Sequence, residues 1–95
     1  MVNNIRGSMP IIPIEEAMIH AMEDIAALDE LISKEQNKWL KCAWEYHLKL
    51  NVAIIGYLTI ENLIMAQIYI NELNRSIRAT CNYIEAAPSA RLQGK

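Results

Sequence analysis

The sequence predicts an all-α chain of three helices, a long helical hairpin with one preceding helix, that form a helical bundle. The 95 residues include only three glycines and three prolines, and Gly56 is the only helix-breaking residue between positions 14 and 87. β proteins of this length carry many more turn residues. Two long segments also place apolar residues at alternating spacings of three and four, which is typical of helices with a heptad seam.

A chain of this length fits one domain. We expect a single helical domain over residues 13–87, between flexible tails at residues 1–12 and 88–95. Hydrophobic residues make up 53 % of the chain, slightly more than in an ordinary soluble domain. A chain of this length buries on folding only about 60–65 % of the surface that it exposes when unfolded. The excess of hydrophobic residues therefore favours burial against a second chain.

The charge, the cysteines and the most apolar stretch bear on location. The formal net charge of −2 is not the footprint of a general nucleic-acid binder. Cys42 and Cys81 stand alone, without the spacing of a disulfide framework, which favours a reducing compartment and hence the cytoplasm. Residues 50–70 are the most apolar stretch, but Glu61 would lie inside the bilayer if this segment crossed a membrane. We therefore expect no membrane association.

The first helix is expected from Pro13 to Ile32, because proline suits the first helical position. Its outer face carries Glu16, Glu23 and Glu30 at intervals of seven residues. This acidic ridge is a candidate docking face for a basic partner. The apolar seam on the other side consists of Ile14, Met18, Ala21, Ile25, Leu28 and Ile32.

The second helix is expected from about Lys34 to Ile55. Ser33 and Gln36 match a capping box, which predicts a tight bend before it; the alternative is one unbroken helix. Residues 52–55 could instead form a strand, although no partner strand is evident. The seam consists of Leu40, Ala43, His47, Leu50 and Ile54. A polar, mainly basic stripe at helical spacing consists of Lys34, Lys38, Lys41, Glu45 and Lys49, in which Glu45 interrupts the lysines.

The third helix is expected from about Ile60 to Ala87, ended by Pro88. Gly56 is a candidate for a left-handed residue after the second helix, and Thr59 is a candidate N-cap for the third. The seam of the third helix consists of Leu63, Ala66, Ile70, Leu73, Ile77, Thr80 and Ile84.

The first half of the third helix is apolar on every side. A helix of this kind has to be covered all round, and an exposed apolar patch of several hundred Å² is unusual for a monomer. A two-fold copy of the same chain is the simplest cover. The expected homodimer interface consists of Ile60, Ile64, Met65, Ile68 and Tyr69.

No constellation of residues favours catalysis. His20 and Asp24 could offer two ligands to a metal, but metal sites need three or four. His47 and Cys42 lack the orienting group and oxyanion hole of a nucleophilic pair. We expect neither an enzyme nor a cofactor or metal, and we interpret His47 as a packed, hydrogen-bonded core residue.

The favoured function is a non-enzymatic protein–protein interaction module, such as an adaptor, small chaperone or protein inhibitor, that acts as a homodimer. Aromatic residues contribute most at protein contacts, so Trp39 and Trp44 join the acidic ridge as candidates for contact with another protein. The alternative is a small nucleic-acid-associated regulator that uses the lysines of the second helix with Arg75 and Arg78. The low net charge does not favour nucleic acid as a partner.

Overall fold

The computed structural model describes residues 13–86, which form three helices and no strand. Helix α1 spans Ile14–Lys34, α2 spans Lys38–Thr59 and α3 spans Leu63–Ala86. The all-α, three-helix prediction is confirmed. Two alternatives are wrong: the first two helices are not one continuous helix, and residues 52–55 do not form a strand. The expected tails lie outside the described residues.

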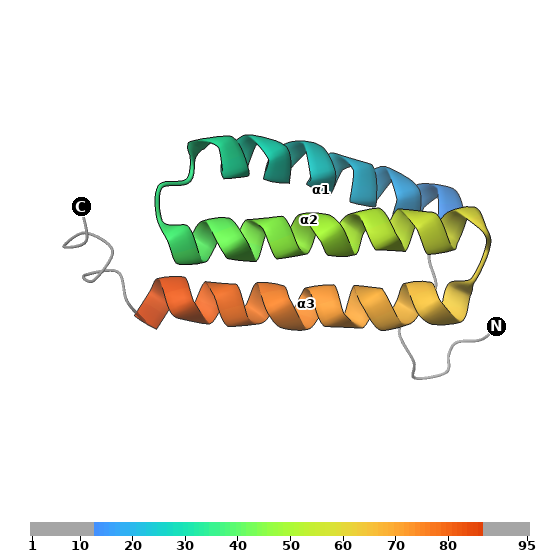
Figure 1. Ribbon diagram of the computed structural model, residues 1–95. Coiled ribbons are helices and arrows are strands. Elements are labelled where there is room, and N and C mark those ends of the chain that lie inside the picture. The colour runs from blue at the N-terminus through green and yellow to red at the C-terminus, as the bar shows by residue number, and fades with distance from the viewer. Residues whose placement is uncertain (1–12, 87–95) are drawn as a thin grey trace.

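The central helix of the fold is α2. Successive helices run antiparallel, and α2 lies between α1 and α3 (Figure 1). The main helix–helix contacts within residues 13–86 are α1 with α2 and α2 with α3. Helices α1 and α3 therefore depend on α2 for most of their burial, and they contact each other little.

The core follows the expected seams closely in α1 and α2. Every seam residue of these two helices is buried or half-buried. In α3, Ala66, Leu73 and Thr80 are buried as expected, but Leu63 and Ile77 are exposed, and their assignment to the core is wrong. The reason is that α3 packs mainly on α2, so part of its seam has no facing helix. The buried apolar residues are Ala21, Leu28, Leu40, Leu50, Ile54, Leu58, Ala66 and Leu73.

The bend between α1 and α2 does not use the expected capping box. Helix α1 continues to Lys34, and the Ser33 hydroxyl donates to the Glu30 carbonyl at 2.8 Å inside that helix. The cap of α2 is Asn37, whose Oδ1 accepts from the backbone N–H of Leu40 at 3.0 Å. An asparagine in extended conformation serves this role as well as serine.

The expected roles of Gly56 and Thr59 are also wrong. Gly56 lies within α2 and does not have a positive φ. Thr59 is the last residue of α2, and its hydroxyl donates to the Ile55 carbonyl at 2.7 Å. Helix α2 thus ends about one turn later than the sequence pattern indicated, at Thr59, because a glycine inside a helix costs only about 1 kcal/mol and does not by itself end it.

The left-handed residue after α2 is Glu61, with φ 58°. The backbone N–H of Glu61 donates to the Leu58 carbonyl at 3.0 Å, and that of Asn62 donates to the Tyr57 carbonyl at 2.8 Å. These two bonds are those of a Schellman motif, in which glycine is the usual left-handed residue. Asn62 then caps α3, since its Oδ1 accepts from the N–H of Met65 at 3.1 Å.

Replacing Gly56 with alanine is expected to stabilise the fold by about 0.5–1 kcal/mol, because glycine has a high conformational entropy in the unfolded chain. A Cβ built at this position meets nothing within 4 Å. Urea unfolding followed by circular dichroism measures the change. Glu61→Ala is the matched control and should bring no comparable gain, because alanine is strained at a left-handed position. A destabilising Gly56→Ala would contradict the helical placement of Gly56.

Candidate interaction surface

The residues expected at a dimer interface lie around the turn between α2 and α3. Ile60, Ile64 and Ile68 are 68 %, 76 % and 51 % exposed. Met65 and Tyr69 are half-buried, and the Tyr69 ring contacts that of Tyr57 at a centroid distance of 5.3 Å. We call these five expected residues the α3 patch. Three of them are open to a partner, and two are partly occupied within the chain.

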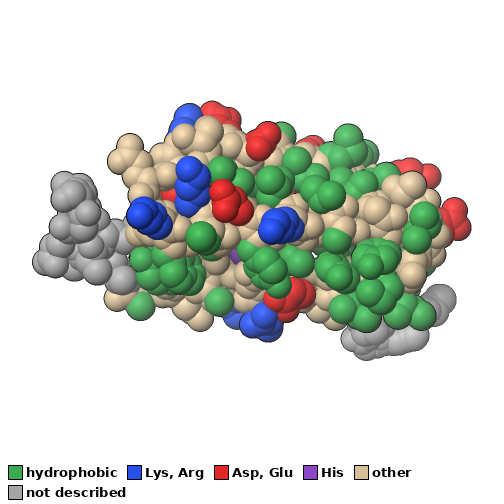
Figure 2. Space-filling model, in the orientation of Figure 1, with side chains coloured by type: hydrophobic (Ala, Val, Ile, Leu, Met, Phe, Trp, Pro, Cys, Tyr) green, Lys and Arg blue, Asp and Glu red, His purple; other side chains and the backbone are tan. Residues whose placement is uncertain are grey.

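Helical spacing explains why these isoleucines are exposed together. Ile64 and Ile68 are four residues apart and share one side of α3, and Ile60 precedes them in the turn. That side faces away from buried Ala66 and Leu73. Figure 2 shows hydrophobic side chains gathered near the end of the molecule where α2 and α3 are joined. Large adjacent apolar side chains of this kind mark a contact surface more often than isolated ones do.

The two tryptophans have different environments. Trp39 is exposed and stacks on Tyr83, with ring centroids 4.1 Å apart. Trp44 is half-buried, and its Nε1 donates to Oε1 of Glu35 at 3.0 Å. Trp39 is therefore accessible to another protein, whereas Trp44 fixes the turn between α1 and α2. Spacing along the sequence did not distinguish the two.

The acidic ridge is exposed along α1. Glu16, Glu23 and Glu30 are all exposed. His20 lies between the first two, with ring nitrogens 3.7 Å from Glu16 Oε2 and 4.0 Å from Glu23 Oε1. Lys34 Nζ lies 2.9 Å from Glu30 Oε2. Exposed pairs of this kind contribute little to stability, and Lys34 partly offsets the negative charge at the Glu30 end of the ridge.

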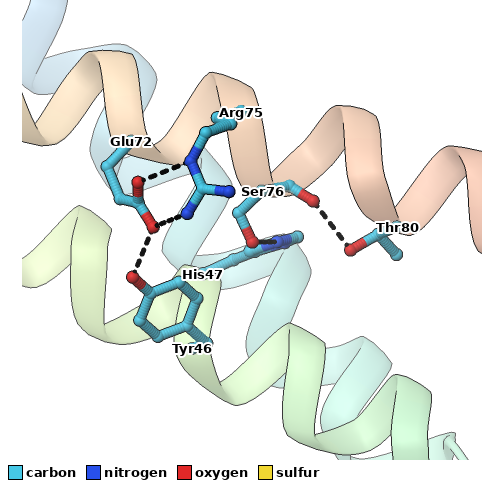
Figure 3. Close-up of polar contacts among 6 residues, drawn as sticks. All are labelled: Tyr46, His47, Glu72, Arg75, Ser76 and Thr80. Carbon is cyan, nitrogen blue, oxygen red and sulfur yellow. Dashed lines mark hydrogen bonds and ion pairs between the residues drawn. The ribbon is translucent and has the colours of Figure 1, made fainter.

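A polar cluster that sequence reasoning missed joins α2 to α3 (Figure 3). The Tyr46 hydroxyl donates to Glu72 Oε2 at 2.6 Å, and Arg75 donates to both oxygens of the same carboxylate at 2.9 and 2.6 Å. The Arg75 and Tyr46 hydrogen bonds lower the pKa of Glu72, and the bond to Glu72 raises the pKa of Tyr46. The i,i+3 spacing of Glu72 and Arg75 was the only signal in the sequence.

Arg75 is thus already paired with a carboxylate, and this weakens its assignment to a nucleic-acid surface. Arg78 is exposed on the same helix, and Lys38, Lys41 and Lys49 are exposed on α2. These basic groups lie on two helices and do not form one continuous groove of the kind that follows a phosphate backbone.

His47 is a buried, hydrogen-bonded residue at the contact between α2 and α3. It is 2 % exposed, and its Nε2 lies 2.8 Å from the Ser76 hydroxyl oxygen (Figure 3). Its backbone carbonyl accepts from Nδ2 of buried Asn51 at 3.0 Å. Burial lowers the pKa of His47, and this shift is partly opposed by hydrogen bonding with the Ser76 backbone. The imidazole is therefore neutral at pH 7 and serves packing.

The described residues contain neither a cluster of metal ligands nor a membrane-spanning helix. Within residues 13–86, no group of three His, Cys, Asp or Glu side chains could hold a metal ion. Cys42 and Cys81 are free and exposed on different helices. None of the three described helices combines the length and apolarity needed to cross a bilayer.

Comparison with known proteins found no match to the chain among protein-family models, curated proteins or solved structures.

The stability of the fold is expected to decrease below about pH 6.5 because of His47. The pKa of this group is lower in the folded chain than its ordinary value of 6.5, so the unfolded chain binds a proton first as the pH falls. The contribution of neutral His47 is complete above the ordinary value and is lost as the pH falls toward the lowered pKa. Urea unfolding between pH 5 and 8 measures this slope, and His47→Gln should flatten it. An unchanged slope in the variant would contradict the assignment.

Proposed function

We propose that this chain is a non-enzymatic helical interaction module that acts as a homodimer and presents further surfaces to another protein. The observation that carries the proposal is the exposure of Ile60, Ile64 and Ile68 beside one another at the α2–α3 turn. Exposing adjacent large aliphatic side chains to water is unfavourable by about 25 cal/mol for each Å². A surface that binds a partner recovers this free energy.

A second copy of the chain fits the α3 patch best. The patch is apolar, and apolar surfaces need no matching pattern of charges or hydrogen bonds, so a two-fold axis can place the patch against itself. Met65 and Tyr69 are half-buried. They would connect the exposed isoleucines at the interface with the core between α2 and α3. Obligate homodimer interfaces have this core-like character.

The surfaces that remain exposed in such a dimer support an adaptor, small chaperone or inhibitor role. Trp39 lies away from the α2–α3 turn, at the opposite end of α2, and the acidic ridge lies on α1, which packs on the other side of α2 from α3. A dimer would display both features twice. Aromatic side chains with a charged surround are common at the centres of protein interfaces.

Replacing Ile64 and Ile68 with alanine is expected to weaken the dimer by about 2–5 kcal/mol for each site that becomes fully buried. Light scattering over a hundredfold range of concentration should show two chains for the parent protein and a shift toward one chain for the double variant. Leu31→Ala, an exposed apolar residue of α1, is the matched control and should leave the mass unchanged. A parent protein that is a monomer at every concentration would refute the homodimer.

A further inference from the structure

The two halves of α3 are held against α2 by different kinds of contact. In the first half, Ala66 and Leu73 belong to a cluster of buried apolar residues that includes three residues of α2. No described residue after Leu73 packs against this cluster. The only buried residue among the described residues of the second half is Thr80, whose hydroxyl donates to the Ser76 carbonyl of the same helix at 2.9 Å. We call residues 76–86, which lie outside the apolar cluster, the latch.

Side chains at two levels join the latch to α2. At the first level, the Ser76 hydroxyl oxygen lies 2.8 Å from Nε2 of His47 (Figure 3). At the second level, the Tyr83 ring stacks on Trp39, with ring centroids 4.1 Å apart. The Tyr83 hydroxyl also accepts from Nδ2 of Asn37, the cap of α2, at 3.3 Å. Of these contacts, the one with His47 lies nearest to the apolar cluster.

His47 is the one group in these contacts that changes its charge between pH 5 and pH 8. It is buried, and besides Ser76 it meets the edge of the Trp44 ring, with ring centroids 5.8 Å apart. A hydroxyl both donates and accepts, so Ser76 accommodates either neutral tautomer of the imidazole. A second proton on the ring would place a positive charge among neutral partners.

No charged side chain of α2 or α3 is free to offset such a charge. The nearest carboxylate on α3 is that of Glu72, one turn before Ser76. It is already bound to Arg75 of the same helix and to the Tyr46 hydroxyl of α2 (Figure 3). The ion pairs formed within residues 13–86 do not include His47.

Helix α1 offers no opposite charge either. Ile14 packs against the cluster that contains Leu58, and the two helices run antiparallel (Figure 1). Ile25 lies eleven residues after Ile14, and His47 lies eleven residues before Leu58, so half-buried Ile25 is at the level of His47. The charged residues of α1 nearest to this level are exposed: Glu23, Asp24 and Asp29. A charge buried without a partner is strongly unfavourable.

We propose that the latch is a pH-sensitive device: a proton on His47 releases residues 76–86 from α2, while the first half of α3 stays on the apolar cluster. In the closed form, burial lowers the pKa of His47. In the open form, water surrounds the imidazole, and its pKa returns to the ordinary value of 6.5. The open form binds the proton more tightly, so its population rises as the pH falls below about 6.5. All of these groups belong to one chain, so the device does not depend on the homodimer proposed above.

Amide hydrogen exchange followed by NMR at pH 7.5 and pH 5.0 tests the proposal. The protection of each amide is compared after correction for the intrinsic effect of pH on exchange. The amides of residues 77–84 are expected to lose up to about thirtyfold in protection, because pH 5.0 is 1.5 pH units below the ordinary pKa of histidine. A released segment of this length keeps little helix in water. The amides of residues 67–73 are the internal control and should keep their protection.

Three variants assign the effect to His47. His47→Gln offers Ser76 a hydrogen-bond partner that takes up no proton, and it should keep the latch closed at pH 5.0. His20→Gln removes the other histidine of the chain, which is exposed on α1, and should leave the release unchanged. Ser76→Asp places a carboxylate beside His47 and should also keep the latch closed in acid, because the charged imidazole then has a partner. Circular dichroism at pH 7.5 checks that each variant keeps its helices.

The parent protein alone is enough to overturn the proposal. Equal protection of residues 77–84 at the two pH values would do so, as would a loss that spreads equally over α1 and residues 67–73. An NMR titration of the His47 ring that gives a pKa at or above 6.5 would also overturn it. Among the variants, a release that persists in His47→Gln or disappears in His20→Gln would contradict the role of His47.

Discussion

The structure depends on the burial of α2 between two antiparallel neighbours. Helices α1 and α3 each pack on α2 and contact each other little, so α2 provides the common surface of the fold. It contributes four of the buried apolar residues, Leu40, Leu50, Ile54 and Leu58. Because α1 and α3 each cover α2 from one side only, each retains apolar residues that no helix of residues 13–86 covers. The exposed surfaces are therefore a consequence of the layout of the core.

Buried polar groups in this core have their hydrogen-bond partners nearby. His47 contacts Ser76, and Asn51 donates to a carbonyl one turn before it in α2. The Thr80 hydroxyl donates to the Ser76 carbonyl. A buried polar group without a hydrogen-bond partner costs about 1–3 kcal/mol, and these hydrogen bonds avoid that cost. The bond between His47 and Ser76 also sets the register of α2 against α3, because it requires two particular residues to meet.

Charge and apolar surface are distributed unevenly over the molecule. The acidic residues concentrate on α1, the unpaired lysines on α2, and the most exposed isoleucines near the α2–α3 turn. In the described residues, the shortest ion pair between side chains is Glu72 with Arg75, at 2.6 Å within one helix. The charges of α1 and α2 thus add little to the stability of the single chain.

The sequence by itself determined the three helices, the faces of α1 and α2 that are buried, and the isoleucines that lie outside the seam of α3. These features depend on spacing within a helix, which is local and visible in the residue order. Only the tertiary structure decided that Asn37 and Asn62 act as caps, that Glu61 takes the left-handed position, and that Leu63 and Ile77 are exposed. It also decided that Tyr46 meets Glu72 and that Trp44 is fixed by Glu35. The side-chain contacts depend on which distant segments of the chain meet. The caps and helix ends depend on which of several possible residues packing favours. A periodic pattern of apolar residues contains neither kind of information.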